Sequence, residues 1–119
     1  MDRISAPIIR ENEGIDSKLR SIGLSAAELD HVFISHMDFD HTSGLRLVRA
    51  AREIRTAQEE WNACSKFSLR YVDTWTGICD VKPFSYRRSG IGPVGRSYDV
   101  FDDGTVLLVH TPGHTRGMF

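Results

Sequence analysis

His36-Met37-Asp38-Phe39-Asp40-His41 places four potential metal ligands within six consecutive residues of this 119-residue chain. A second histidine-bearing stretch, His110-Thr111-Pro112-Gly113-His114, lies close to the end of the sequence. Imidazole and carboxylate groups are common protein ligands of zinc and of other divalent metals. Together the two stretches predict a metal site that joins segments far apart in the chain.

Each stretch follows a segment with the composition of a β-strand. Residues 31–35 form a β-branched and aromatic run that ends at the first stretch, and residues 105–109 form a run that ends at the second. Residues 98–101 are expected to pair with residues 105–109 across a turn at Asp102-Asp103-Gly104. Because rigid strands that end in adaptable loops let several side chains converge, this arrangement favours a metal site.

The order of residues in the first stretch favours two metal ions. His36, Asp38 and Asp40 alternate along the chain, and alternate side chains of an extended segment face the same way. The adjacent His41 then faces another way. Neighbouring ligands that diverge suit a dinuclear centre better than a single ion.

The chain between residues 15 and 66 follows the order helix, strand, loop, helix, strand, helix. This order rests on apolar spacing, on β-branched runs and on residues typical of helix ends. The expected elements are a helix at residues 15–22 that stops at Gly23, a capping box at Ser25-Ala26-Ala27-Glu28, a helix with Leu45, Leu47 and Val48 on its apolar side, a short strand at residues 54–57, and a helix from Glu59.

Two segments are expected to carry no site. Every third residue from 46 to 55 is arginine, and these side chains are expected to form a solvated face rather than a phosphate-binding one. Residues 67–97 lose periodicity and have glycines without phosphate-loop spacing, so an irregular insertion is expected. Trp61 and Trp75 are expected to pack in the interior. The aromatic residues that are expected to anchor the insertion, or alternatively to line an apolar substrate mouth, are Tyr71, Phe84 and Tyr86.

Composition narrows the classes of function. A hydrophobic content of 40% and a charged content of 26% are typical of a folded, water-soluble domain, and a net charge of -1 gives no positive field for nucleic acid. The sequence has no stretch of membrane-spanning length and no signal-peptide core, so a cytoplasmic location without membrane contact is expected. Cys64 and Cys79 are expected to be reduced and structural; a ligand or nucleophile role for one of them is the alternative.

The segment from Ser35 to His41 resembles the H-x-H-x-D-H signature of the metallo-β-lactamase superfamily, and Thr111-Pro112-Gly113-His114-Thr115 resembles its T-P-G-H-T element. Flanking residues such as Gly92-Pro93 and Asp103-Gly104 are most similar to lactonase-like members, such as the acyl homoserine lactonases. The resemblance covers most of the chain after residue 15. It implies an α/β fold, the αβ/βα sandwich of the superfamily, with the metals at one sheet edge.

The resemblance also implies that residues 1–119 form a single but partial domain. The family has a β-hairpin before the first helix, and it supplies a bridging carboxylate and a final histidine after the T-P-G-H-T element. We therefore expect a fragment or a truncated gene product, incomplete at both ends.

For the site, the resemblance implies His36 and His114 on the first metal, and Asp40 and His41 on the second. Asp38 stands where the family usually has histidine, and it is expected either to bind metal or to hydrogen-bond a neighbouring ligand. As a hard carboxylate ligand it would shift preference from zinc toward manganese or iron. Asp40 is the expected catalytic residue, because it would also accept a hydrogen bond from the nucleophile. His31 and His110 are expected to be structural or surface residues, and His110 matches no ligand position.

The function implied is metal-dependent hydrolysis of a small ester, lactone or thioester by a metal-bound hydroxide. Two alternatives remain open. One is a diiron redox protein of the flavo-diiron type, which carries a carboxylate at the position of Asp38. The other is a truncated metal-binding fragment without turnover. The sequence does not specify an oligomeric state.

Overall fold

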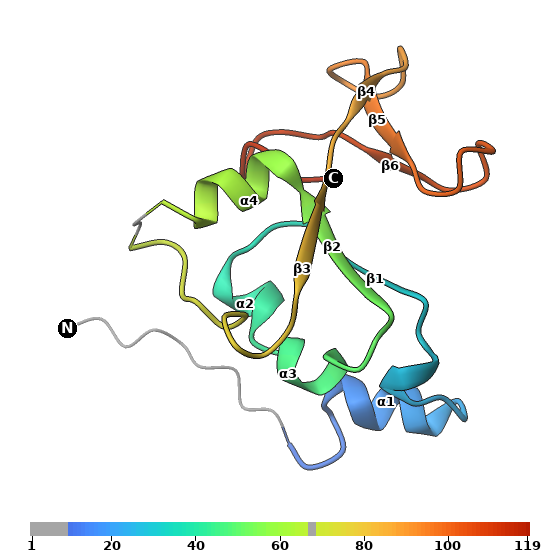
Figure 1. The fold of residues 1–119 in the computed structure, drawn as a ribbon, viewed down its shortest axis with the longest axis vertical. Helices are drawn as coiled ribbons and strands as arrows, with labels where there is room; N and C mark the ends of the chain where they lie inside the picture. The colour runs from blue at the N-terminus through green and yellow to red at the C-terminus, as the bar shows by residue number, and fades with distance from the viewer. Residues whose placement is uncertain (1–9, 67–68) are drawn as a thin grey trace.

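A three-stranded parallel sheet, in the order β1-β2-β3, lies at the centre of the structure (Figure 1). The computed structural model describes residues 10–66 and 69–119. Its parallel strands are β1 (His31–Ile34), β2 (Glu53–Ala57) and β3 (Val81–Phe84). An antiparallel sheet, in the order β4-β5-β6, has strands Arg87–Arg88, Arg96–Asp99 and Leu107–Val109. The strands predicted around residues 31–35 and 54–57 are confirmed.

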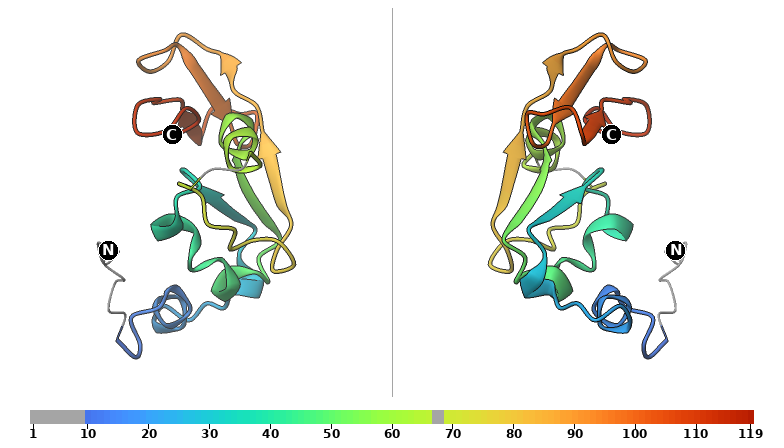
Figure 2. Two further views of the ribbon diagram at one scale, coloured as in Figure 1. Left: turned by 90° about the vertical axis from the view of Figure 1, so that its left-hand side faces the viewer. Right: turned by 90° about the vertical axis from the view of Figure 1, so that its right-hand side faces the viewer.

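Short helices precede and connect the parallel strands. Before β1 come α1 (Ile15–Ser21) and a 3₁₀ turn, η1 (Ala26–Glu28). Figure 2 shows the two helices between β1 and β2 together on one side of the parallel sheet, with the antiparallel sheet beyond its upper end. These helices are α2 (Phe39–Thr42) and α3 (Leu45–Val48), and α4 (Gln58–Cys64) follows β2 directly.

The predicted helix ends before β1 are confirmed. Gly23 follows α1 with a φ of 79°, a conformation that glycine adopts without a steric penalty. In the capping box, the Glu28 carboxylate accepts hydrogen bonds from the backbone amide and the hydroxyl of Ser25, at 2.7 and 2.9 Å.

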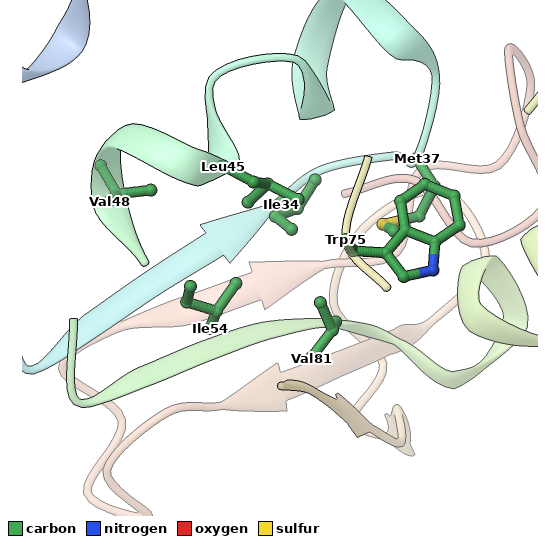
Figure 3. Close-up of a cluster of buried hydrophobic side chains, with 7 residues drawn as sticks. All are labelled: Ile34, Met37, Leu45, Val48, Ile54, Trp75 and Val81. Carbon is green, nitrogen blue, oxygen red and sulfur yellow. The ribbon is translucent and has the colours of Figure 1, made fainter. Parts of the chain in front are cut away.

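The main hydrophobic core lies between the parallel sheet and helix α3 (Figure 3). Strand residues Ile34, Ile54 and Val81 meet Leu45 and Val48 of α3 there. Trp75 and the fully buried Met37 complete this core at the end of β1. Because Met37 stands between two expected metal ligands, its burial fixes the loop that carries them.

A second, aromatic cluster packs between the two sheets. Buried Phe84 and Tyr86 meet Ala57 there, and Tyr98 of β5 stacks on Phe84 with ring centroids 4.4 Å apart. Because side chains alternate between the two faces of a strand, one face of the parallel sheet packs against the main core and the other face packs against the aromatic cluster. Trp75, Phe84 and Tyr86 are therefore packing residues, as expected.

The prediction of an irregular insertion at residues 67–97 is correct for residues 69–80, which form only turns and irregular structure, but wrong for the strands that follow. The segment supplies β3, the outer strand of the parallel sheet, as well as β4 and the start of β5. β3 was not predicted because lysine and proline, which are uncommon in strands, stand at positions 82 and 83. An edge strand such as β3 can nevertheless accommodate a proline. Residues 67 and 68 of this prediction lie outside the described residues.

The arginine face is also only partly as predicted. Arg46, Arg49 and Arg52 are exposed, whereas Arg55 lies in β2 and faces the aromatic cluster. Its guanidinium carbon lies 5.1 Å from the ring centroid of Tyr98, and the guanidinium donates a hydrogen bond to the Tyr98 hydroxyl. This arginine therefore packs between the sheets through a cation–π contact.

The antiparallel pairing near the end of the chain is confirmed, with a longer connection than predicted. β5 pairs with β6, and Ser97 lies opposite Val109. The connection runs from Val100 to Val106 and contains the expected Gly104 turn, where Asp99 accepts a hydrogen bond from the Gly104 amide at 2.7 Å. Among the described residues, no helix has both the length and the apolar character needed to cross a membrane.

Candidate metal centre

The first ligand stretch begins where β1 ends. The Thr56 hydroxyl of β2 donates a hydrogen bond to the Ile34 carbonyl at 2.9 Å, which fixes the last residue of β1. Beyond it, Asp38 lies on extended backbone as the N-cap residue of α2, which begins at Phe39. The predicted alternation of three ligands therefore fails at Asp40, because a helical turn, not a strand, carries it. Aspartate at position 38 was the missed signal, since aspartate is a preferred N-cap residue.

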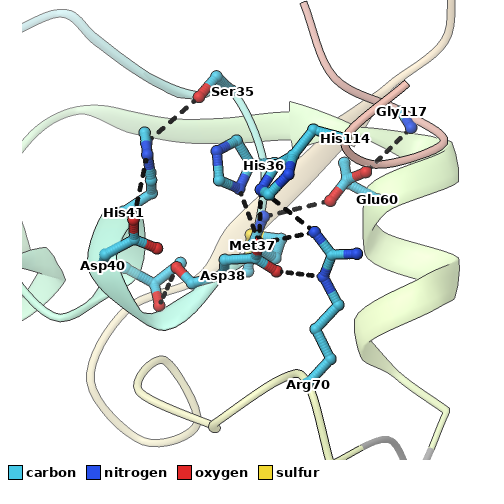
Figure 4. Close-up of polar contacts among 11 residues, drawn as sticks. Ser35, His36, Met37, Asp38, Asp40, His41, Glu60, Arg70, His114 and Gly117 are labelled. Carbon is cyan, nitrogen blue, oxygen red and sulfur yellow. Dashed lines mark hydrogen bonds and ion pairs between the residues drawn. The ribbon is translucent and has the colours of Figure 1, made fainter. Parts of the chain in front are cut away.

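Three of the predicted ligands gather in one cluster. Imidazole nitrogens of His36 and His114 and a carboxylate oxygen of Asp38 all lie within 4.8 Å of one another. His114 Nε2 is 2.9 Å from Asp38 Oδ2, and His36 Nδ1 is 3.6 Å from the same oxygen (Figure 4). These separations are close to those between ligands around one ion, given metal–ligand distances of about 2.0–2.2 Å. We name this set the ligand cluster.

His36 is the buried member of the ligand cluster. Its side chain is only 7% exposed, yet Nδ1 has no hydrogen-bond partner among the described residues. Burial lowers the pKa of His36, and the nearby His41 lowers it further. The imidazole is therefore neutral near pH 7, with a buried nitrogen that faces the other two ligands.

Asp38 is held in its ionised form by an arginine. Arg70 Nε and Nη2 donate hydrogen bonds to the two Asp38 carboxylate oxygens at 2.7 and 2.8 Å. This paired hydrogen bonding holds the pKa of Asp38 below its usual value. Sequence reasoning missed Arg70, because it lies 32 residues beyond Asp38 in a segment without a clear pattern.

Asp40 and His41 lie beside the ligand cluster but outside it. The His41 ring centroid is 3.9 Å from that of His36, and the Ser35 hydroxyl lies 3.4 Å from His41 Nδ1. Asp40 Oδ2 is 3.7 Å from His41 Nε2, and the Asp40 side chain is 73% exposed. The structure thus brings these two residues together as a pair next to the first cluster.

A fully buried glutamate connects the two ligand loops. Glu60 of α4 accepts hydrogen bonds from the Met37 amide at 3.2 Å and from the Gly117 amide at 2.9 Å. Gly117 must be glycine here, because a Cβ atom would lie 2.6 Å from the Glu60 backbone nitrogen. One carboxylate therefore ties the loop of His36 and Asp38 to the loop of His114.

The family model of the metallo-beta-lactamase superfamily matches residues 4–119 of the chain. The chain belongs to this superfamily. The resemblance expected from the two histidine motifs is thereby confirmed.

Curated relatives of this superfamily member are N-acyl homoserine lactonases. The chain is 26% identical over 117 residues to the N-acyl homoserine lactonase AttM of Azorhizobium caulinodans, and 25% identical over 118 residues to that of Rhizobium johnstonii. Each match covers 93% of this chain but only 42% of the relative. The chain thus spans about two fifths of the length of these relatives.

Solved structures of the superfamily confirm the fold. The chain matches an N-acyl homoserine lactone hydrolase with N-hexanoyl-L-homoserine bound at its catalytic metal centre, with a TM-score of 0.70 and 23% identity. It also matches an AiiA variant from B. thuringiensis with bound N-decanoyl-L-homoserine, with a TM-score of 0.70 and 22% identity. Both matches cover 91% of this chain and 38% of the other. The predicted α/β fold of metallo-β-lactamase type is correct.

Members of the metallo-β-lactamase superfamily generally bind divalent metals, and the ligand cluster fits such an ion. The decisive observation is the buried Nδ1 of His36, which has no partner among the described residues. An unsatisfied buried nitrogen costs free energy unless something binds it. Two imidazoles and a carboxylate suit zinc, manganese or iron.

The remaining histidines and the cysteines lie apart from the ligand cluster. His110 is buried, stacks on Tyr86 with centroids 4.3 Å apart, and bonds through Nε2 to the Arg116 carbonyl at 2.7 Å. His31 lies beside Phe33 and Glu53 at the start of β1. Cys64 and Cys79 are free, and burial raises the pKa of the Cys64 thiol to about 11. Cys64 and Cys79 pack against the main core, and His110 packs on Tyr86, while a structural role for the partly exposed His31 stays a prediction.

Tyr86→Phe should destabilise the loop of this superfamily member that carries His114. The Tyr86 hydroxyl donates a buried hydrogen bond of 2.6 Å to the Gly117 carbonyl. Its removal leaves that carbonyl without this donor, which should lower the free energy of unfolding by about 1–3 kcal/mol. Urea denaturation followed by circular dichroism measures the change. A variant as stable as the wild type would show that this bond contributes nothing to the loop.

Proposed function

We propose that the chain belongs to a metal-dependent hydrolase that opens the lactone ring of N-acyl homoserine lactones or closely related small molecules. The observation that carries this proposal is the ligand cluster, with its buried His36 nitrogen that has no hydrogen-bond partner among the described residues. The matches to curated lactonases supply the substrate class. Residues 1–119 act as one metallo-β-lactamase-like domain in this proposal.

In this proposal His36, Asp38 and His114 hold one ion, and Asp40 and His41 hold a second. Ions bound there would supply Lewis acidity, which would polarise the lactone carbonyl and lower the pKa of water to about 7, so that hydroxide would be available near neutral pH. Asp38 would shift the metal preference from zinc toward manganese or iron, because it adds a hard oxygen ligand. Asp40, largely exposed beside His41, would accept a proton or a hydrogen bond from the attacking water.

An open hollow of ≈ 450 Å³ borders the ligand cluster and offers room for the substrate. Pro112 and Gly113 form part of its wall next to His114, and the half-buried Tyr71 forms another part. The residues that line it are Ala63, Arg70, Tyr71, Pro112, Gly113, His114, Thr115 and Arg116. A substrate in this hollow would have its lactone carbonyl beside the ions held by the cluster. Its acyl chain would lie along the wall formed by Pro112 and Gly113.

Purified chain loaded with zinc or manganese should hydrolyse N-hexanoyl-homoserine lactone to N-hexanoyl-homoserine. Chromatography of the product measures the rate, and chelator should abolish it while the fold, followed by circular dichroism, persists. Restoring the metal should restore the rate. Turnover that survives complete removal of metal would contradict the proposal.

The same preparation tests the two alternatives. A metal-binding fragment without turnover would hold ions in the wild type but release no product. A diiron redox protein would contain iron after purification and would accept electrons from a reduced flavin partner. The relatives found by sequence are lactonases, which favours the hydrolase over the diiron protein.

A further inference from the structure

The positively charged guanidinium of Arg70 contacts the ligand cluster. Arg70 reaches it from the segment after α4, and its guanidinium points at Asp38 and His114 (Figure 4). Both Asp38 oxygens accept hydrogen bonds from it, at 2.7 and 2.8 Å. The pairing is well sheltered on the carboxylate side, because the Asp38 side chain is only 15% exposed.

One nitrogen of Arg70 contacts the two atoms that a metal would join. Arg70 Nη2 lies 2.8 Å from Asp38 Oδ2 and 3.2 Å from His114 Nε2. Nη2 is within hydrogen-bond distance of both atoms, so an ion that used the same lone pairs would have to displace its N–H groups. A divalent ion held by these two atoms would also stand close to the positive guanidinium and be repelled by it. The guanidinium and the ion therefore compete for Asp38 Oδ2 and His114 Nε2.

We propose that Arg70 competes with the divalent ion for Asp38, so that metal enters the ligand cluster only when the guanidinium leaves. Without metal, Arg70 neutralises a carboxylate that would otherwise stand unpaired beside two imidazoles. With metal, the ion neutralises the same carboxylate and Arg70 turns toward solvent, which its 41% exposed side chain can reach. Arg70 thus weakens metal binding and raises the free-ion concentration at which the ligand cluster fills. This inference rests on the proposed function, because it needs the ligand cluster to bind metal.

Arg70→Gln should therefore bind metal more tightly. Losing the competing cation should lower the Kd for Zn²⁺ and for Mn²⁺ by on the order of tenfold, the size expected for a paired, charge-assisted contact. Arg70→Lys keeps the charge and should stay within about threefold of the wild type. Isothermal titration with each metal alone, against a chelator of known affinity, measures the Kd values.

Arg96→Gln is the matched control. Arg96 is bonded to Glu59 at 2.9 Å, and its side chain is 37% exposed, yet it does not contact the ligand cluster. Its substitution should leave the Kd unchanged. Circular dichroism on each variant establishes that the chain is folded before titration.

The outcomes separate this inference from the proposed function. Tighter binding by Arg70→Gln alone supports the competition. Equal Kd values for wild type and Arg70→Gln, or weaker binding by the variant, would overturn it and leave the proposed metal site intact. Equal tightening by Arg70→Lys would overturn the role of the charge. Failure of every folded variant to bind either metal would overturn both proposals.

Discussion

The double variant His36→Ala/His114→Ala should contain no bound metal after purification, whereas the wild type should contain zinc, manganese or iron. The two substitutions remove both imidazoles of the ligand cluster and leave only Asp38. Removal of a residue that merely supports a metal ligand costs about 10–100-fold in affinity, so loss of two ligands should cost at least about 100-fold. Elemental analysis of the purified proteins measures the metal per chain.

His31→Ala is the control for this double variant. His31 is a histidine outside the ligand cluster, at the start of β1, and its loss should leave the metal content unchanged. The stoichiometry of the wild type also tests the proposed second ion at Asp40 and His41, since that pair should raise the content from one ion per chain to two. Wild-type metal content in the folded double variant would remove the basis of the proposed function.

Glu60→Ala should be the most destabilising of the substitutions considered. The carboxylate is fully buried and accepts hydrogen bonds from the Met37 and Gly117 amides. Its loss leaves two amide donors without partners and opens a cavity, so the free energy of unfolding should fall by about 3–5 kcal/mol. Glu60→Gln should lose about 1–3 kcal/mol, because an amide offers an acceptor to only one of the two donors.

Thermal and urea denaturation of the metal-free proteins measure these losses. Glu59→Gln is the matched control, because Glu59 is the adjacent residue, is partly exposed, and forms one ion pair, with Arg96. Its loss should cost no more than about 1 kcal/mol. If Glu60→Gln retains enough structure, its metal affinity should fall as well, because the two ligand loops lose their common attachment. A Glu60→Gln variant as stable as Glu59→Gln would refute the role of Glu60.

The sequence predicted the site best where the structure is local. His36 and Asp38 follow directly from β1, so their convergence could be anticipated from a strand and the loop after it. His114 could be included in the predicted site because it lies within the T-P-G-H-T motif of the family. The placement of Asp40 and His41 was harder, since six residues are compatible with either a strand or a helical turn.

Contacts between distant segments could not be predicted in this way. Arg70 meets Asp38 across 32 residues, and no periodic pattern marks it. Glu60 stands near the start of α4 beside Glu59, where acidic residues are ordinary on an exposed face. Only the folded loops bury one of these two glutamates and leave the other partly exposed. β3 was missed for the related reason that its pairing with β2, not its composition, makes it a strand.

The burial of Met37 couples the packing of the hydrophobic core to the proposed metal affinity. Its side chain fills the hydrophobic core beside Trp75, while the residues before and after it, His36 and Asp38, are the proposed metal ligands. A mutation that repacks this core, even far from His114, shifts the backbone from which His36 and Asp38 project. If His36 and Asp38 bind metal as proposed, selection of this chain for greater thermal stability would therefore change its metal affinity too, and selection on metal affinity would in turn constrain which core substitutions are tolerated.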